Sequence, residues 1–511
     1  MRSTRLPALL AAGLIVLTAC GSGGGDAPEN IQLVAGRMAS GVDPVDDQSS
    51  SYLRSYGAAE GLTKIQADGS VAPELAESVS QTAPNRWTVT LRDGARFWSG
   101  APADAGAVAA SLERSRGNST LAQGLLDGVT ITTPDARTIV FTTEAPSPYL
   151  DYALAHYSMV IHNAGAYDGA DPTDASVADL TGPFELTGFE TERSVTLVRN
   201  DDWWGGAVAA PGVDVELVTD EQSRAEIGLA GQADIIDMFP SGRAEEADAA
   251  GLDVESAAGA TTVAVYLNQN STQAPALADQ RVRQALGWGT DREKVVALAT
   301  NGLAAPLPSW LASNPAYPQA DESGFVSHEP ERARELLDQA GWTAGPDGLR
   351  SKDGRPLRIR MLTFGTEAAT GEVLQAQWRE LGVDVQVRNV ESSLATQAIK
   401  SGDWDTATQA WTTVGSAPSL IGNQIAPDGA ANHGAYDVPV VPGLLQQAST
   451  APTAAAREQA MLEVNDVMNT VVPAVPVHTR VAAVGLAADV EGFTPHPLQY
   501  ENLVNSNVST S

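Results

Sequence analysis

The chain has 511 residues, of which 43% are hydrophobic and 18% are charged. This length exceeds what one hydrophobic core supports, so two or three domains are expected. The 63 Asp and Glu residues outnumber the 31 Lys and Arg residues, giving a formal net charge of −32, and such a surface argues against nucleic acid as a partner. The single cysteine excludes an intrachain disulfide and a metal site built from several cysteines.

The first 30 residues are typical of an exported protein. Two arginines precede an apolar run, Leu9 to Val16, that is too short to span a membrane. We therefore expect residues 1–19 to be a signal peptide. The residues that follow, Leu-Thr-Ala-Cys, resemble the lipobox of bacterial lipoproteins. This resemblance implies that Cys20 becomes the first mature residue and carries lipid. The Gly-rich residues 20–30 would then be a flexible tether. A cysteine that happens to end a signal peptide is the alternative.

Residues 71–115 contain the clearest local pattern of the chain. Trp87, Val89 and Leu91 alternate with threonines, which predicts a strand with one apolar side. A turn follows at Gly94. Beyond it, apolar residues three and four positions apart predict a helix that Asp104 caps.

The later part of the chain reads as alternating strands and helices. Alternation predicts a strand at residues 213–218, and residues 262–267 read as another strand. A last helix, 454–469, precedes residues 473–477, which we expect to be the return crossing between lobes. Strand, helix and strand over residues 357–387 form a βαβ unit. We therefore expect an α/β lobe in this region.

The sequence motif in residues 71–115, APELAES…WTVTLRDGARFWSGAP, is more specific than the pattern of apolar residues alone. It resembles the signature of family 5 of the bacterial extracellular solute-binding proteins, which serve peptide and nickel ABC importers. Residues 182–204 resemble the family's GP(Y/F)…RN…YW block, and residues 279–286 resemble its D.RVRQAL block. Ala103 stands where the family usually has threonine. A generic α/β surface unit that matches by chance is the alternative.

The resemblance implies the fold and its division into parts. We expect an α/β fold of the periplasmic-binding-protein-like type II, with two lobes, an extra subdomain in the N-terminal lobe and a hinge of two crossings near Asn268 and Val477. The expected ranges are 31–55, 182–268 and 478–505 for lobe I, 56–181 for the extra subdomain and 269–477 for lobe II.

Sequence patterns of catalytic sites are absent. The chain contains no HExxH, no G-x-S-x-G elbow and no Walker loop. Its six histidines show no ligand-like spacing beyond His156 and His162, and for these two unliganded histidines are the favoured interpretation. We therefore expect a protein that is not an enzyme and that has no cofactor and no metal centre.

The resemblance also implies where a ligand binds. In the family, the loop after the first strand lies along the cleft; here it contains Arg37 and Met38. The sequence around Trp404 and Trp411 resembles the family's G.(F/W)D…..W motif. In the family the segment after this motif lines the pocket, and here that segment contains Gly415 and Ser416. Peptide-binding members often carry an Asp in that segment to pair with the ligand's amino group, and this chain has none, so a peptide amine needs another anchor. Core packing is the alternative for Trp411.

Nickel-chelate binders of the family suggest a second set of residues. They surround an anionic chelate with Arg, His, Met and Trp side chains. The counterparts by position are His156, with Arg114 or Arg116 nearby, together with His433 and with Tyr52, which falls where a Met is expected. An exposed loop histidine is the alternative for His433.

The expected function is that of a lipid-anchored, extracytoplasmic receptor. It would capture a peptide or peptide-like solute between its lobes and deliver it, as a monomer, to the permease and ATPase subunits of an ABC importer. A nickel-chelate binder of the same family is one alternative. A surface sensor or adhesion lipoprotein without transport is another.

Overall fold

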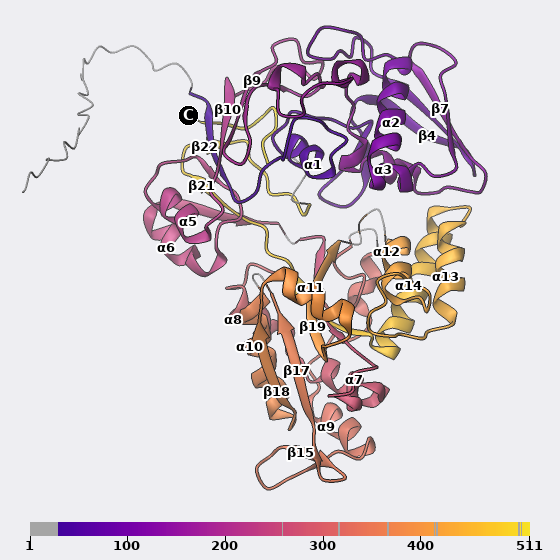
Figure 1. The fold of residues 1–511 in the computed structure, drawn as a ribbon, viewed down its shortest axis with the longest axis vertical. Coiled ribbons are helices and arrows are strands. Elements are labelled where there is room, and N and C mark those ends of the chain that lie inside the picture. Colours follow the sequence, from indigo (N-terminus) through magenta and orange to yellow (C-terminus); the bar gives the residue numbers. More distant parts are fainter. Residues whose placement is uncertain are drawn as a thin grey trace, which may run out of the picture.

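The computed structural model describes residues 29–511, apart from Ala258, residues 315–316, 365–366, Thr413, residues 415–416, 499–500, Asn502 and Ser511. The expected signal peptide, Cys20 and most of the tether therefore lie outside the described residues. The chain forms two α/β lobes, one from its N-terminal half and its end, the other from residues in between (Figure 1). No helix among the described residues has both the length and the apolar character needed to cross a membrane.

Lobe I is built on a seven-stranded sheet in the order β12-β21-β11-β1-β10-β9-β8. Strand β1 runs parallel to β10 and β11, and the other pairs are antiparallel. The strands are β1 (Ile31–Ala35), β8 (Phe184–Glu190), β9 (Ser194–Arg199), β10 (Gly212–Leu217), β11 (Ile235–Ile236), β12 (Leu252–Ser256) and β21 (Ala483–Ala487); the helices are α1 (Asp47–Ser55), α5 (Glu221–Leu229) and α6 (Ala244–Ala250).

The extra subdomain has a four-stranded antiparallel sheet in the order β4-β5-β7-β6. The predicted alternation is confirmed, because Trp87, Val89 and Leu91 are all buried in its core. The predicted cap is confirmed as well: the Asp104 side chain accepts a hydrogen bond from the Ala107 N–H (2.9 Å). Its elements are β4 (Ala76–Ala83), β5 (Arg86–Leu91), β6 (Val129–Thr132), β7 (Thr138–Thr143), α2 (Ala105–Asn118), α3 (Thr120–Leu125) and α4 (Leu150–Leu154), with the hairpin β2 (Thr63–Ile65) and β3 (Val71–Pro73) beside it.

Lobe II is built on a five-stranded sheet in the order β18-β17-β19-β13-β20. The predicted βαβ unit is confirmed, since β17 and β18 are parallel and α10 joins them. The strands are β13 (Thr261–Leu267), β17 (Arg358–Thr363), β18 (Asp384–Asn389), β19 (Thr406–Thr412) and β20 (Ala474–Thr479); the helices are α7 (Gln280–Trp288), α8 (Arg292–Ala299), α9 (Pro330–Gln339), α10 (Ala368–Glu380), α11 (Ser392–Ser401), α12 (Ala417–Ile425), α13 (Val440–Ser449) and α14 (Ala454–Val471).

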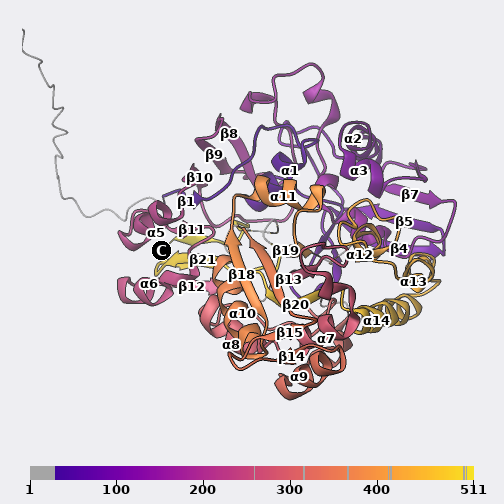
Figure 2. The same ribbon diagram turned by 60° about the horizontal axis from the view of Figure 1, so that its bottom comes forward.

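Two separate cores cover the faces of this sheet. One contains buried side chains of α7, α9 and α10, and the other contains those of α12, α13 and α14. Figure 2 shows the two helix groups on different sides of the strands. The remaining elements are β14 (Thr343–Ala344), β15 (Arg350–Lys352), β16 (Arg355–Pro356), β22 (Val490–Glu491) and β23 (Ser509–Thr510), and the 3₁₀ helices η1 (Tyr157–Met159), η2 (Ala164–Tyr167), η3 (Ala175–Val177), η4 (Ser241–Arg243), η5 (Pro275–Ala278) and η6 (Pro318–Glu322).

The sheet pairing corrects the expected position of the first crossing. Strand β13, which the sequence analysis placed in lobe I, pairs with β19 and β20 of lobe II. The segments that join the two sheets are therefore residues 257–260, before the expected Asn268, and residues 480–482, near the expected Val477. The apolar run TTVAVYL predicts a buried strand, but periodicity does not tell which of two sheets buries it. The other boundaries stay predictions.

Candidate functional site

The carboxyl ends of the parallel strands lie at the hinge in both lobes. In lobe I, the start of β21 pairs with the end of β11 (Gly485 with Ile236). In lobe II, β18, β17 and β19 are parallel, and the start of β13 pairs with the end of β19 (Thr261 with Thr412). Because β21 and β13 are the strands that the two crossings enter, both sets of carboxyl ends face the other lobe. Loops at such ends are where open α/β sheets bind ligands.

On the lobe I side, three polar groups gather at the ends of β1 and β11. Arg37 follows β1 and is exposed, Asp237 follows β11 and is half-buried, and Tyr52 comes from α1. Burial raises the pKa of Tyr52 to about 12; the Arg37 guanidinium opposes this shift and the Asp237 carboxylate adds to it. Burial also raises the pKa of Asp237 to about 6, against the Met238 backbone N–H and the charges of Arg224 and Arg37. The structure thus brings predicted Arg37 and Tyr52 together with an acid.

The sequence analysis missed Asp237. The available signal was an acid placed directly after the buried pair Ile235–Ile236, at the carboxyl end of a strand. By contrast, the predicted Met38 is only 4% exposed and packs in the hydrophobic core of lobe I. The thioether of Met38 therefore stabilises the lobe and does not line the surface between the lobes.

On the lobe II side, aromatic rings stand at the end of β19. Trp411 lies 5.0 Å from Trp310 and 5.2 Å from Tyr266, measured between ring centroids. Its ring is nearly buried, and no described atom accepts a hydrogen bond from the indole N–H of Trp411 or Trp310. Trp404 is 1% exposed and packs in the same core. The predicted Gly415 and Ser416 lie outside the described residues.

The two predicted histidines belong to different lobes. His156 caps η1, because its Nδ1 accepts a hydrogen bond from the Ser158 N–H (3.2 Å). Burial, with a contribution from the charge of Arg54, lowers the pKa of His156 to about 4, so its ring is neutral at pH 7. His433 is half-buried in the loop between α12 and α13.

The two predicted arginines of α2 have structural partners. Arg114 donates two hydrogen bonds to the Asp43 carboxylate (2.8 and 2.7 Å), and its guanidinium lies 4.9 Å from the Tyr167 ring centroid. Arg116 donates to the Val129 carbonyl (2.8 Å) and pairs with Glu113. These contacts tie α2 to its surroundings and occupy donors of both guanidinium groups; a ligand contact of Arg114 or Arg116 stays a prediction.

A small pocket of about 110 Å³ lies between the lobes beside the second crossing. Lobe I contributes Met238 to it, and lobe II contributes Glu367 and His478. Glu367 forms an ion pair with Arg480 of the crossing (2.9 Å). This ion pair and a hydrogen bond between His478 Nε2 and the Thr370 hydroxyl (2.9 Å) tie the end of β20 and the second crossing to the start of α10.

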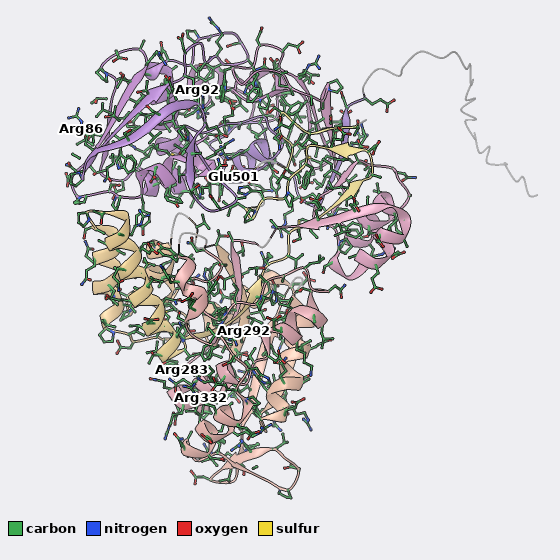
Figure 3. All side chains as sticks on the ribbon, turned by 180° about the vertical axis from the view of Figure 1, so that it is seen from behind. Arg86, Arg92, Arg283, Arg292, Arg332 and Glu501 are labelled. Atoms are coloured by element: carbon green, nitrogen blue, oxygen red, sulfur yellow. The ribbon has the colours of Figure 1, made fainter. Side chains whose placement is uncertain are left out.

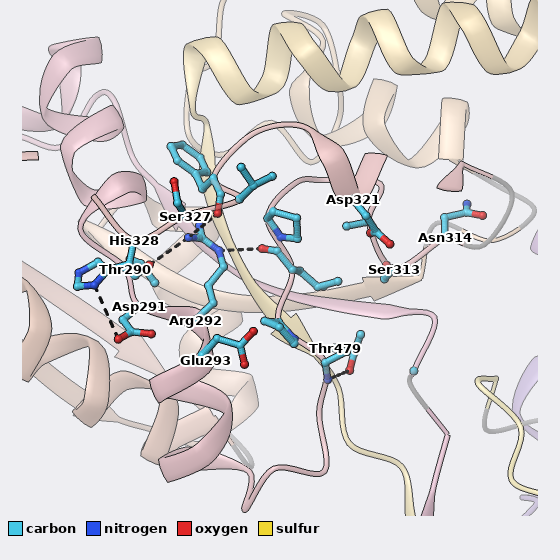
Figure 4. Close-up of a pocket in the computed structure, with 18 of the residues that line it drawn as sticks. Thr290, Asp291, Arg292, Glu293, Ser313, Asn314, Asp321, Ser327, His328 and Thr479 are labelled. Atoms are coloured by element: carbon cyan, nitrogen blue, oxygen red, sulfur yellow. Dashed lines mark hydrogen bonds and ion pairs between the residues drawn. The ribbon is translucent and has the colours of Figure 1, made fainter. Parts of the chain in front are cut away.

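A larger cavity of about 660 Å³ lies beside the edge strand β20, where residues 305–307 hydrogen-bond to that strand (Figure 4). Most of its walls come from lobe II, and Ala67 and Pro497 cover it from the other lobe. The Arg292 guanidinium in its wall donates to the carbonyls of Leu307 and Pro476 (2.8 and 2.9 Å). Burial without a carboxylate partner lowers the pKa of Arg292 to about 9. The predicted ligand-binding residues do not line this cavity.

The described side chains offer no metal centre. Within the ranges that the structure describes, no group of three or more His, Cys, Asp or Glu side chains could hold a metal ion. Among the described residues, the two facing edges offer the Arg37 guanidinium, the Asp237 carboxyl group and aromatic rings. This set can bind a solute with charged and apolar parts.

Comparisons with known proteins agree with this architecture. Residues 70–431 match the model for the middle part of the bacterial extracellular solute-binding proteins, family 5. The chain is 28% identical to the nickel-binding periplasmic protein of Escherichia coli over 353 residues, which is 65% of this chain and 66% of that protein. It is 23% identical to the oligopeptide-binding protein OppA of Bacillus subtilis over 380 residues, 69% of each. The crystal structure of NikA from Brucella suis in complex with Fe(III)-EDTA shares the fold, with a TM-score of 0.82 at 22% identity over 94% of this chain and 100% of that one.

Proposed function

Because the chain belongs to family 5 of the bacterial extracellular solute-binding proteins, we propose that it captures a peptide or peptide-like solute between its two lobes and delivers it to the permease of an ABC importer. It is a type II periplasmic-binding-protein fold that binds rather than catalyses. The observation that carries the proposal is that the carboxyl-end loops of both sheets face each other and are joined by two crossings.

Closure around the solute supplies the signal for delivery. A solute that touches both lobes binds the closed arrangement more tightly than the open one, and the difference in affinity shifts the population towards the closed form. The permease then recognises that form, while ATPase subunits on other chains supply the energy. The proposed mechanism therefore needs groups that can contact the solute on both lobes.

We assign the contacts of a peptide by charge. Asp237 is the acid that the segment after Trp411 lacks, and it can pair with a free amino group of the solute. Arg37 can pair with a carboxylate, and Tyr52 and Trp411 supply apolar surface from the two lobes. This arrangement favours a peptide over a bare metal ion.

A nickel chelate is the second candidate. Its support is the 28% identity to a nickel-binding protein. The side chains that such a chelate would use are less favourably placed, since Arg114 is paired with Asp43 and the Nδ1 of His156 accepts a hydrogen bond from the Ser158 N–H. We therefore rank it behind a peptide.

Calorimetry tests the solute class. We expect saturable heat with short peptides at pH 7.5 and weaker binding at pH 5, because Asp237, whose pKa is about 6, is then largely protonated. Asp237→Asn should weaken binding of a peptide with a free amino group about tenfold or more, since a charge partner is lost. An N-acetylated peptide should bind the wild type more weakly than the same peptide with a free amino group. Its affinity for Asp237→Asn should be close to its affinity for the wild type.

Asp253→Asn is the matched control, because Asp253 is an exposed acid on the edge strand β12 of the same sheet. It should bind peptides as the wild type does. Saturable heat with nickel–histidine mixtures but not with peptides would show that the solute is a nickel chelate. Saturable heat with neither would contradict both candidates.

A further inference from the structure

One contact between the lobes lies away from both crossings. It joins the extra subdomain to α14 of lobe II, and Figures 1 and 3 show α13 and α14 beside the strands of the subdomain. Three side chains make it: Tyr149, at the start of α4, and Tyr317 and Arg457 of lobe II. We call this set the latch.

The latch combines three different interactions. The hydroxyls of Tyr149 and Tyr317 are 3.2 Å apart and share a hydrogen bond. The Arg457 guanidinium carbon lies 3.9 Å from the centroid of the Tyr149 ring. Arg457 Nη1 also donates to the Pro148 carbonyl (2.8 Å). A cation over an aromatic face and a charged donor on a carbonyl each stabilise a contact.

Both sides of the latch are firmly attached to their lobes. On the subdomain side, the Trp87 indole N–H donates to the Ser147 carbonyl (2.8 Å), next to Pro148. On the other side, Asn465 of α14 accepts from the Leu311 N–H (3.1 Å) and donates to the Ser323 hydroxyl (2.8 Å). The latch therefore joins segments that are themselves hydrogen-bonded to their own lobes.

We propose that Tyr149, Tyr317 and Arg457 are positioning residues that hold the extra subdomain against lobe II and thereby set the fraction of molecules whose lobes are together. Every atom of the latch belongs to the chain, so its contribution does not depend on the solute. The effect on solute affinity rests on the function proposed above: if only the closed form holds solute on both sides, the apparent dissociation constant varies inversely with the closed fraction.

The distance between the lobes tests the latch without any solute. Leu121→Cys on α3 and Val440→Cys on α13, both at exposed positions (40% and 51%), allow spin labels on the two sides in a soluble form that starts after Cys20. In Arg457→Ala we expect about a tenfold shift of the population towards longer distances, from loss of the ring contact and the carbonyl bond. Tyr149→Phe keeps the ring and should give a smaller shift in the same direction.

Arg332→Ala is the matched control. The Arg332 guanidinium lies 3.8 Å from the Trp288 ring, but both residues belong to lobe II (Figure 3). It should leave the distance distribution unchanged. The proposal is overturned if the distance distribution of Arg457→Ala superimposes on that of the wild type. It is also overturned if Arg332→Ala shifts the distribution as much as Arg457→Ala does.

Solute binding provides a second, independent readout. For any solute that the wild type binds, Arg457→Ala should weaken affinity by up to about tenfold, the factor expected for the population shift. Arg332→Ala should leave the affinity unchanged. A protein that binds none of the tested peptides but still shows the distance shift would contradict the proposed solute class and leave the latch standing. Unchanged affinity together with a shifted distance would overturn the link between the latch and binding.

Discussion

At the scale of single residues, lobe I contains carboxyl groups that are removed from water and held by specific donors. Glu60 accepts hydrogen bonds from the indole N–H groups of Trp203 (3.2 Å) and Trp204 (2.8 Å). Arg54 forms ion pairs with Glu74 (3.0 Å) and Glu501 (2.9 Å), which lies inside the lobe (Figure 3). Neutral donors and one guanidinium do not fully offset the loss of hydration at Glu60 and Glu501, so these two acids bind protons more tightly than exposed ones.

The stability of the protein should therefore fall as pH rises. Burial, reinforced by the nearby charge of Glu74, raises the pKa of Glu60 from 4.5 to about 8, and burial raises that of Glu501 to about 7. Between pH 4.5 and 8 the folded protein holds a proton at Glu60 that the unfolded chain has lost, so its contribution to stability is full below pH 4.5 and is lost as pH passes 8. We expect a lower melting temperature at pH 8.5 than at pH 7, above the range in which the unfolded chain binds protons at the positions of the buried, neutral His156 and His162.

Two variants separate Glu60 from the rest of the protein. Glu60→Gln cannot titrate, so its melting temperature should depend less on pH over this range than that of the wild type. Glu144→Gln changes an exposed acid of the same subdomain and should keep the wild-type dependence. Equal slopes for Glu60→Gln and the wild type would show that Glu60 is ionised throughout.

At the scale of elements, helix α2 shows how one local feature serves the whole lobe. Asp104 caps its start, and Arg114 near its end reaches Asp43 in the loop after β1. The pKa of Asp43 stays below its usual range because hydrogen bonds and the charge of Arg114 outweigh the opposing effect of burial, so this pair persists at neutral pH. The helix therefore connects the subdomain to lobe I, and its cap contributes to that connection.

Removal of the Asp104 cap should lower the stability of the protein measurably. Asp104→Ala leaves the Ala107 N–H without its side-chain acceptor, and we expect a loss of about 1 kcal/mol in the free energy of unfolding, measured by chemical denaturation. Asp127→Ala, at an exposed position after α3, should change it by less than about half of that. A loss equal to that of Asp127→Ala would mean that water replaces the cap without cost.

At the scale of the whole molecule, two features decide how the lobes meet. The crossings lie side by side, because Ser256 pairs with Ala483 in one sheet and Thr262 pairs with Thr479 in the other. They also approach closely: a Cβ added to Gly259 would lie 2.5 Å from the Arg480 carbonyl oxygen, so glycine is needed there. The latch is a contact between the lobes that lies away from these crossings.

The place of the whole molecule in the cell depends on Cys20. We propose that it carries lipid and holds lobe I near the membrane surface through the tether. Cells that express the full chain should incorporate labelled fatty acid into the protein, and Cys20→Ser should abolish the label and release the protein into the soluble fraction. Labelling that persists in Cys20→Ser would place the anchor elsewhere.

The sequence by itself determined the elements and the family. Trp87, Val89 and Leu91 predicted their strand, Asp104 predicted the start of α2, and residues 357–387 predicted a βαβ unit, because each of these patterns is complete within a short stretch of chain. The words of residues 71–115 identified the family, which the matched range 70–431 then showed.

Only the tertiary structure decided which side chains are free to meet a solute. The sequence did not show that Arg114 has a partner in Asp43, 71 residues away. Asp237 and Arg37 come together only because β11 and β1 are neighbours in one sheet. β13 belongs to lobe II because of its pairing with β19 and β20. The physical reason is common to all three: propensity and periodicity act between near neighbours in sequence, whereas ion pairs, burial and strand pairing are decided by residues that the fold alone brings within contact distance.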